Sequence, residues 1–146
     1  MRKIRFRGIS MDDGKWVEGY YAAHHIPKKD NHDKVVGMEE VHCIFNDEPN
    51  NRSKGSYWHI VNPATIGQFT GCYDMAGKPI WEGDVVEKQN YPNAGRTRTV
   101  VCFETGAFMT AEPEGHSIDT VLACNMHKNW AVIGNIIETP GWVCID

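Results

Sequence analysis

The sequence contains no long apolar run. None of its hydrophobic stretches reaches the roughly 18 residues that a membrane-spanning helix needs. The basic residues at the start of the chain are not followed by the apolar segment of a signal peptide. We therefore expect a cytoplasmic protein without a membrane segment. With 146 residues, 41% of them hydrophobic and 23% charged, the chain has the size and composition of one globular domain, or of two small lobes sharing a core.

Closely spaced cysteine pairs are also missing. The five cysteines lie far apart, none belongs to a Cys-x-x-Cys pair, and their number is odd. This favours reduced, buried thiols over a disulfide framework. Cys124 and His127 have a spacing found in zinc sites, but no second pair of ligands accompanies them. They form only a candidate metal pair, and we expect neither a resident metal nor a cofactor.

A strong positive charge is absent as well. The net charge is −4, which argues against a protein that simply coats nucleic acid. The charge is uneven, because residues 1–65 carry 10 Lys and Arg against 9 Asp and Glu, whereas residues 66–146 carry 5 against 10. A nucleic-acid interface would therefore have to rely on the first half.

The basic residues of interest alternate along predicted strands. Arg5 and Arg7 share one face of the first predicted strand, and Trp16 begins the strand expected to pair with it. Arg96 and Arg98 lie next to a loop. These five residues are candidates for contact with nucleic acid or a protein partner. A charged outer face is also typical of any solvated sheet, and that interpretation is the one we favour.

Long amphipathic helices are absent, and short segments with period-two alternation take their place. Gly, Pro, Asn and Asp separate these segments, and no internal repeat is present. The pattern predicts a mainly β protein built from small antiparallel sheets. The expected strands cover residues 3–9, 15–22, 40–45, 57–61, 65–71, 85–89, 97–103, 107–111 and 130–137. Residues 24–35 and 46–56 are expected to be loops, and residues 118–124 fit either a short strand or helical turns.

Catalytic motifs are not found in the sequence. It has no Gly-x-Ser-x-Gly, no Ser-x-x-Lys and no phosphate-binding glycine loop. Gly77, Gly83 and Asp84 are predicted to form tight turns, and Gly134 a bulge or a tight bend in the last strand. The five tryptophans and five tyrosines are numerous for this length, and we predict that Trp142, near the chain end, packs on a partner. Exposed sheet edges favour a homo-oligomer.

The most specific pattern lies in residues 66–71 (IGQFTG) and 74–86 (DMAGKPIWEGDVV). Residues 1–8 (MRKIRFRG) and 132–138 (VIGNIIE) flank it near the two chain ends. Together these segments resemble the YopX-like family of bacteriophage and prophage proteins. The resemblance spans almost the whole chain.

The resemblance implies one YopX-like domain over residues 1–146. It would consist of an N-terminal β lobe, about residues 1–65, and a C-terminal lobe, about residues 66–140, folded as an SH3-like barrel or roll. The sequence departs from the family after Pro140, and residues 24–62 match no known pattern. The resemblance implies no established activity, and a fold does not supply one.

Three functions follow as expectations. The first is a phage- or prophage-derived accessory protein in the cytoplasm of a bacterial host. It would act as a non-catalytic binding or assembly module, as a homo-oligomer or with a phage or host protein. The second is nucleic-acid binding through the N-terminal basic strand. The third is an enzyme acting on an unidentified small ligand, which would require a concave site with perturbed titratable groups.

Overall fold

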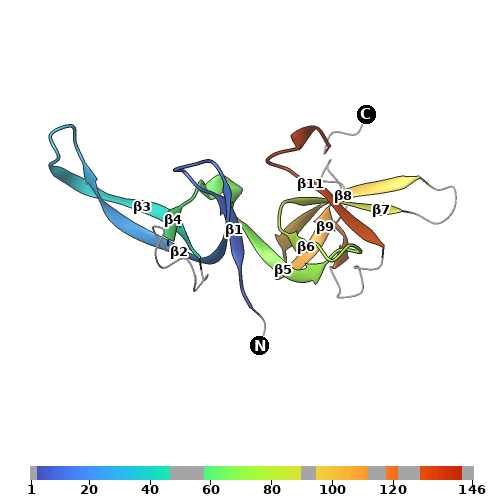
Figure 1. The fold of residues 1–146 in the computed structure, drawn as a ribbon. Helices are drawn as coiled ribbons and strands as arrows, with labels where there is room; N and C mark the ends of the chain where they lie inside the picture. Colours follow the sequence, from blue (N-terminus) through green and yellow to red (C-terminus); the bar gives the residue numbers. More distant parts are fainter. Residues whose placement is uncertain (1–2, 47–57, 90–94, 112–117, 122–128, 143–146) are drawn as a thin grey trace. The chain divides into compact units, whose positions relative to one another are not determined.

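The computed structural model describes residues 3–46, 58–89, 95–111, 118–121 and 129–142. The chain forms two compact units, Ile4–Gly67, and Gln68–Asp146 together with Met1–Lys3. Antiparallel strands build both units, and the described residues include short 3-10 turns but no α-helix (Figure 1). The predicted mainly β class is confirmed. None of the helical turns among these residues is long and apolar enough to cross a lipid bilayer.

The first unit is built on a twisted antiparallel sheet. Its strands are β1 (Phe6–Ile9), β2 (Trp16–Lys29), β3 (Val35–Phe45) and β4 (Trp58–Ile60), in the spatial order β4-β3-β2-β1. The hairpin of β1 and β2 follows the predicted alternation of residues. Its turn contains Gly14 with a φ of 68°, a backbone angle that glycine adopts without steric cost.

The core of the first unit is small. Ile44 and Val61 are 0% and 1% exposed, and Gly8 of β1 packs against both. A Cβ atom at Gly8 would lie 3.1 Å from the Cβ of Val61, so the close approach of β1 depends on glycine. The buried hydroxyl of Thr65 accepts a hydrogen bond of 2.8 Å from the backbone N–H of Ile9, which fixes the end of β1.

The outer halves of β2 and β3 form a long hairpin that extends past their neighbouring strands, and we call residues 23–40 the arm (Figure 1). Every side chain of the arm is exposed except that of Ile26, which is half-buried. At the tip, the Asp30 carboxylate accepts hydrogen bonds from the backbone N–H groups of His32 and Lys34. This Asx-type turn closes a hairpin made largely of polar residues.

The prediction of a loop over residues 24–35 is therefore wrong. Residues 24–29 belong to β2, and β3 begins at Val35 instead of at residue 40. The error has a physical cause. Both faces of the arm meet solvent, so its strands carry no alternation of apolar and polar residues, and cross-strand pairing alone holds them in register.

The second unit contains a five-stranded antiparallel sheet in the order β10-β9-β8-β7-β11. Its strands are β7 (Asp84–Gln89), β8 (Arg96–Glu104), β9 (Ala107–Ala111), β10 (Ile118–Val121) and β11 (Trp130–Asn135). The described part of residues 118–124 is thus a strand, which decides between the two alternatives there. Because β10 and β11 are opposite ends of this order, the described sheet is open, and the expected SH3-like barrel is not confirmed.

A hairpin of β5 (Gly67–Tyr73) and β6 (Pro79–Trp81) precedes this sheet in the chain. The main core of the unit contains Cys72, Ile80, Val86, Val101 and Trp130. Cys72 and Ile80 come from the hairpin and the others from the sheet, so the core joins the two.

The predicted turn devices are found in this unit. Gly77 and Gly83 have φ angles of 80° and 83°. The carboxylate of Asp84, 1% exposed, accepts a hydrogen bond of 2.9 Å from the backbone N–H of Trp81. The ladder between β11 and β7 shifts register just before Gly134, where a side chain would overlap Thr139. These residues shape the backbone, as the sequence predicted.

Candidate functional site: an aromatic pocket at the base of the arm

The predicted N-terminal basic residues lie in and beside β1. Arg7 stands directly opposite Glu18 of β2, and its guanidinium carbon lies 4.8 Å from the centre of the Trp16 ring. Arg5 is half-buried just before the strand. The structure thus brings Arg7 and Trp16 together as a cation–π pair.

Arg96 and Arg98 lie on β8 and share one acidic partner on β7. The Nη1 atom of Arg96 is 3.2 Å from Oε1 of Glu87, and the Nε atom of Arg98 is 2.9 Å from Oε2. Only 14% of the Glu87 side chain is exposed, so this carboxylate is held between the two guanidinium groups. The pair of arginines is therefore partly neutralised within its own sheet.

Three predicted site residues remain, namely Cys124, His127 and Trp142. Cys124 and His127 lie outside the described residues. Trp142 ends the 3-10 turn Pro140–Trp142, and its side chain lies outside the described part of the chain. Within the described part, no group of three or more His, Cys, Asp or Glu side chains is arranged to hold a metal ion.

The described cysteines are placed as structural residues. Cys43 and Cys72 are buried, and Cys102 is half-buried. Burial raises the pKa of the Cys43 thiol. Burial, and to a smaller extent the carboxylates of Glu104 and Glu82, raises the pKa of the Cys102 thiol. A raised pKa disfavours the thiolate, which is the nucleophilic and metal-binding form.

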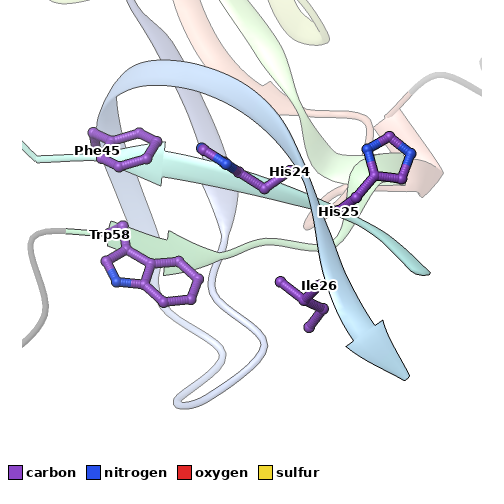
Figure 2. Close-up of a pocket in the computed structure, with 5 residues that line it drawn as sticks. All are labelled: His24, His25, Ile26, Phe45 and Trp58. Carbon is purple, nitrogen blue, oxygen red and sulfur yellow. The ribbon is translucent and has the colours of Figure 1, made fainter. Parts of the chain in front are cut away.

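The candidate site is a pocket that the sequence did not predict (Figure 2). It has a volume of about 310 Å³ and is lined by His24, His25, Ile26, Phe45 and Trp58, which come from β2, β3 and β4. In Figure 2 β2 curves strongly around the pocket. The His24 ring is turned toward Phe45, and the His25 ring points the other way.

Cross-strand register places aromatic rings side by side at the base of the arm. Tyr20 stands directly opposite Phe45, and Phe45 stands directly opposite Trp58. Tyr20 and Trp58 are 45% and 40% exposed, although both are large rings. The His24 and Phe45 ring centres are 5.6 Å apart. Aromatic side chains from three neighbouring strands thus gather at the base of the arm.

A polar cluster occupies the other face of the same strands. The Glu40 carboxylate lies between two imidazoles, with Oε2 at 3.7 Å from Nε2 of His25 and Oε1 at 3.7 Å from Nε2 of His42. The Nδ1 atom of His42 is 2.8 Å from the hydroxyl oxygen of Tyr21. One face of the arm's base is therefore aromatic and the other is hydrogen-bonded and polar.

The chemistry of the described lining residues suits an apolar group. They are aromatic and imidazole rings and one isoleucine. The volume is at the lower end of the range for ligand pockets, about 300–1,000 Å³. Such a pocket suits an aromatic or branched apolar group supplied by a partner.

The sequence held only a partial signal for this pocket. Phe45 ends one predicted strand and Trp58 lies within another, but His24 and Ile26 fell in the segment assigned as a loop. Their meeting depends on the register of β2 against β3 and on the curvature of β2. Neither property can be read from a local pattern of residues.

Comparisons with known proteins agree with this fold. The family model for the YopX protein matches residues 5–143. A solved structure, the protein EF1440 from Enterococcus faecalis, matches with a TM-score of 0.53 and 19% sequence identity, covering 99% of this chain and 100% of that chain. At this identity the likeness concerns the fold alone. No curated protein matches the sequence. Because the family model covers nearly the whole chain, the chain belongs to the YopX protein family.

Proposed function

We propose that this YopX-family protein is a non-catalytic binding and assembly module that works through the arm and the aromatic pocket at its base. We place it, as a phage- or prophage-derived accessory protein, in the cytoplasm of a bacterial host. The family relationship supports this setting.

One observation carries the proposal, namely the exposure of the arm. Val35, Val36 and Met38 are 55%, 58% and 60% exposed on one strand of a two-stranded ribbon. A ribbon of two strands is only marginally stable in water, and clustered exposed apolar residues mark interaction surfaces. A partner that covers this strand would both stabilise the two-stranded ribbon and bury its exposed apolar side chains.

The aromatic pocket supplies a second contact of the kind that dominates protein interfaces. Large aromatic rings that are partly exposed in a free protein contribute much of the binding free energy when a partner buries them. Tyr20 and Trp58 are such rings, and they lie beside the start of the arm. A partner that lies along the arm and inserts an apolar group into the pocket would bury both surfaces.

The two other functions receive less support from the geometry. Arg7 stacks on Trp16, and Arg96 and Arg98 are paired with Glu87, so these cations already have intramolecular partners. Nucleic-acid binding would have to compete with those contacts. An enzyme requires a nucleophile or an acid–base pair in its pocket. The described lining offers the imidazoles of His24 and His25 without a thiol or carboxylate of its own, and the carboxylate nearest His25, that of Glu40, lies on the other face of the strands.

Self-association is the form of binding that we propose. Light scattering on natively purified protein across the micromolar range tests it, with the absorbance ratio at 260 and 280 nm reporting bound nucleic acid. We expect a mass of at least two copies of the 16.5 kDa chain. A variant with Val36→Asn and Met38→Asn should lower that mass. A strictly monomeric wild type would contradict the proposal.

A control variant separates the arm from exposed apolar residues in general. Met11 and Met75 are 64% and 63% exposed but lie outside the arm. The double variant Met11→Asn with Met75→Asn should keep the wild-type mass. If it dissociates as the arm variant does, the arm has no special role.

A further inference from the structure

The arm has two outer edges without strand partners among the described residues. On one side, β1 pairs with β2 only as far as Gly19. On the other side, β4 pairs with β3 only from Cys43 onward. Such edges present backbone N–H and C=O groups that can accept a further strand.

The direction of each backbone group along the arm follows from hydrogen bonds at its base. The backbone N–H of Val61 donates to the carbonyl oxygen of His42 at 2.8 Å, so His42 turns its polar groups away from β2. Because direction alternates along a strand, Glu40 and Met38 also face outward, whereas Glu39 and Val41 face β2. The Phe45 carbonyl oxygen lies against Gly19 of β2, which agrees with this alternation.

The same alternation shows that the outer edge of β2 is closed. Pro27 stands directly opposite the outward-facing Met38, so its nitrogen also faces outward. Proline has no N–H, so it costs the β2–β3 ladder nothing and removes a donor from the outer edge of β2. The outer edge of β3 carries no proline between Val35 and His42. The ladder between β2 and β3 shifts register between Lys28 and Lys29, which leaves Val36 as the extra residue of a bulge. The outer edge of β3 therefore alternates regularly from Gly37 onward, and the outward N–H groups of the arm on this edge are those of Met38 and Glu40.

We propose that the outer edge of β3, from Gly37 to Glu40, pairs with the same edge of a second copy of this chain. The two strands run antiparallel about a two-fold axis, so that one sheet continues from one arm into the other. This inference rests on the proposed function, since it names the partner and the contact through which the arm assembles.

The residues along this edge are complementary to themselves. A two-fold axis at Glu39 or Glu40 would set like charges directly opposite each other, which destabilises a strand pair. An axis at Met38 avoids both arrangements and pairs the outward N–H and C=O groups of Met38 in one copy with those of Met38 in the other. The methionine side chains then meet each other, and no glutamate stands opposite a glutamate.

A pair of proline substitutions tests the edge. Met38→Pro removes an outward N–H from β3, and Ala23→Pro removes one from β2 at an exposed position that also faces outward. Neither change removes a hydrogen bond between β2 and β3. Met38→Thr keeps the N–H and removes the methionine side chain. Circular dichroism and unfolding by urea confirm that each variant folds, and analytical ultracentrifugation measures its dissociation constant.

We expect Met38→Pro to raise the dissociation constant at least about tenfold, because each copy loses an edge donor. Ala23→Pro should leave it unchanged, and Met38→Thr should raise it less than Met38→Pro. A dimer that survives Met38→Pro would overturn the inference and leave assembly through another surface intact. Equal weakening by both prolines would overturn it as well. A wild type that never associates would overturn both this inference and the proposed self-association.

Discussion

Pro27 and Met38 lie directly opposite each other on the arm, at a position where both backbones turn their polar groups outward. Met38 presents an N–H there, and Pro27 cannot. This one difference closes the outer edge of β2 and leaves that of β3 open. An arm with a single open edge can join one partner strand without continuing into a larger array.

Replacing Pro27 tests whether this proline is what distinguishes the outer edge of β2 from that of β3. Pro27→Ala restores a donor on β2 and should allow strands to add at both edges of the arm. We expect species larger than those of the wild type, seen by light scattering as a mass that grows with concentration. A mass profile identical to that of the wild type would show that Pro27 does not limit association.

The pocket can be probed with a hydrophobic fluorescent dye such as anilinonaphthalene sulfonate. Trp58 supplies one wall of the pocket and is 40% exposed. We expect Trp58→Ala to raise the dissociation constant of the dye by about tenfold. This factor corresponds to the loss of one aromatic contact of roughly 1.5 kcal/mol. Met11→Ala, at another exposed apolar residue, should have no effect. Unchanged dye affinity in Trp58→Ala would place the binding surface elsewhere.

Gly19 is predicted to be essential for the position of β3 against β2. A Cβ atom at this residue would overlap the carbonyl group of Phe45, which is backbone and cannot turn aside. Gly19→Ala should therefore lower the free energy of unfolding by about 1–3 kcal/mol, as overpacking does. Urea denaturation measures the loss. Gly141→Ala is the control, since no atom lies within 4 Å of a Cβ placed there.

Asp74 joins the β5–β6 turn to β11. Its Oδ1 atom accepts hydrogen bonds from the N–H groups of Ala76 and Lys78, and its Oδ2 atom accepts one of 3.0 Å from Val132. Burial by itself would raise the pKa of Asp74. The three N–H donors, helped by the charge of Lys78, outweigh burial and hold the pKa below its ordinary value.

A depressed pKa means that Asp74 stabilises the fold above the ordinary carboxyl pKa and loses this effect as the pH falls through its lowered pKa. Asp74→Asn should cost about 1–3 kcal/mol at neutral pH, because an amide N–H₂ would face the N–H of Val132. The variant should also lose part of the acid-dependent change in stability. Urea unfolding at pH 7 and pH 3 measures both effects. Asp13→Asn, at an exposed carboxylate, should change stability less.

Nucleic-acid binding has a direct test in the basic residues of the first strand. We expect no salt-sensitive retention of single- or double-stranded DNA by the wild type at about 50 mM salt, where electrostatic binding is strong. Arg5→Glu combined with Arg7→Glu should therefore change nothing in a gel-shift assay. Retention by the wild type that the double variant abolishes would favour the nucleic-acid function instead.

The features that the sequence predicted correctly are those that depend on neighbouring residues. Gly83 and Asp84 form their turn through contacts within a few positions, and the short hairpin of β1 and β2 pairs the two strands that the sequence predicted. Local chemistry is enough in such cases.

The arm and the pocket could not be predicted in this way. Lys28 and Lys29 extend β2 although both strand faces meet water, so no periodicity marks the strand. His24 meets Phe45 only because β2 pairs with β3 across a distant turn. Register and curvature are properties of the assembled sheet, and single segments do not contain them.

Hydrogen exchange at individual backbone amides of the arm tests the central claim most directly. The N–H groups of Glu39 and Val41 face β2 and should exchange slowly at every protein concentration. Those of Met38 and Glu40 face outward, and they should become protected only as the concentration rises and a second copy pairs with β3. Exchange at Met38 and Glu40 that stays fast in concentrated samples, while Glu39 and Val41 are protected, would contradict the proposed pairing.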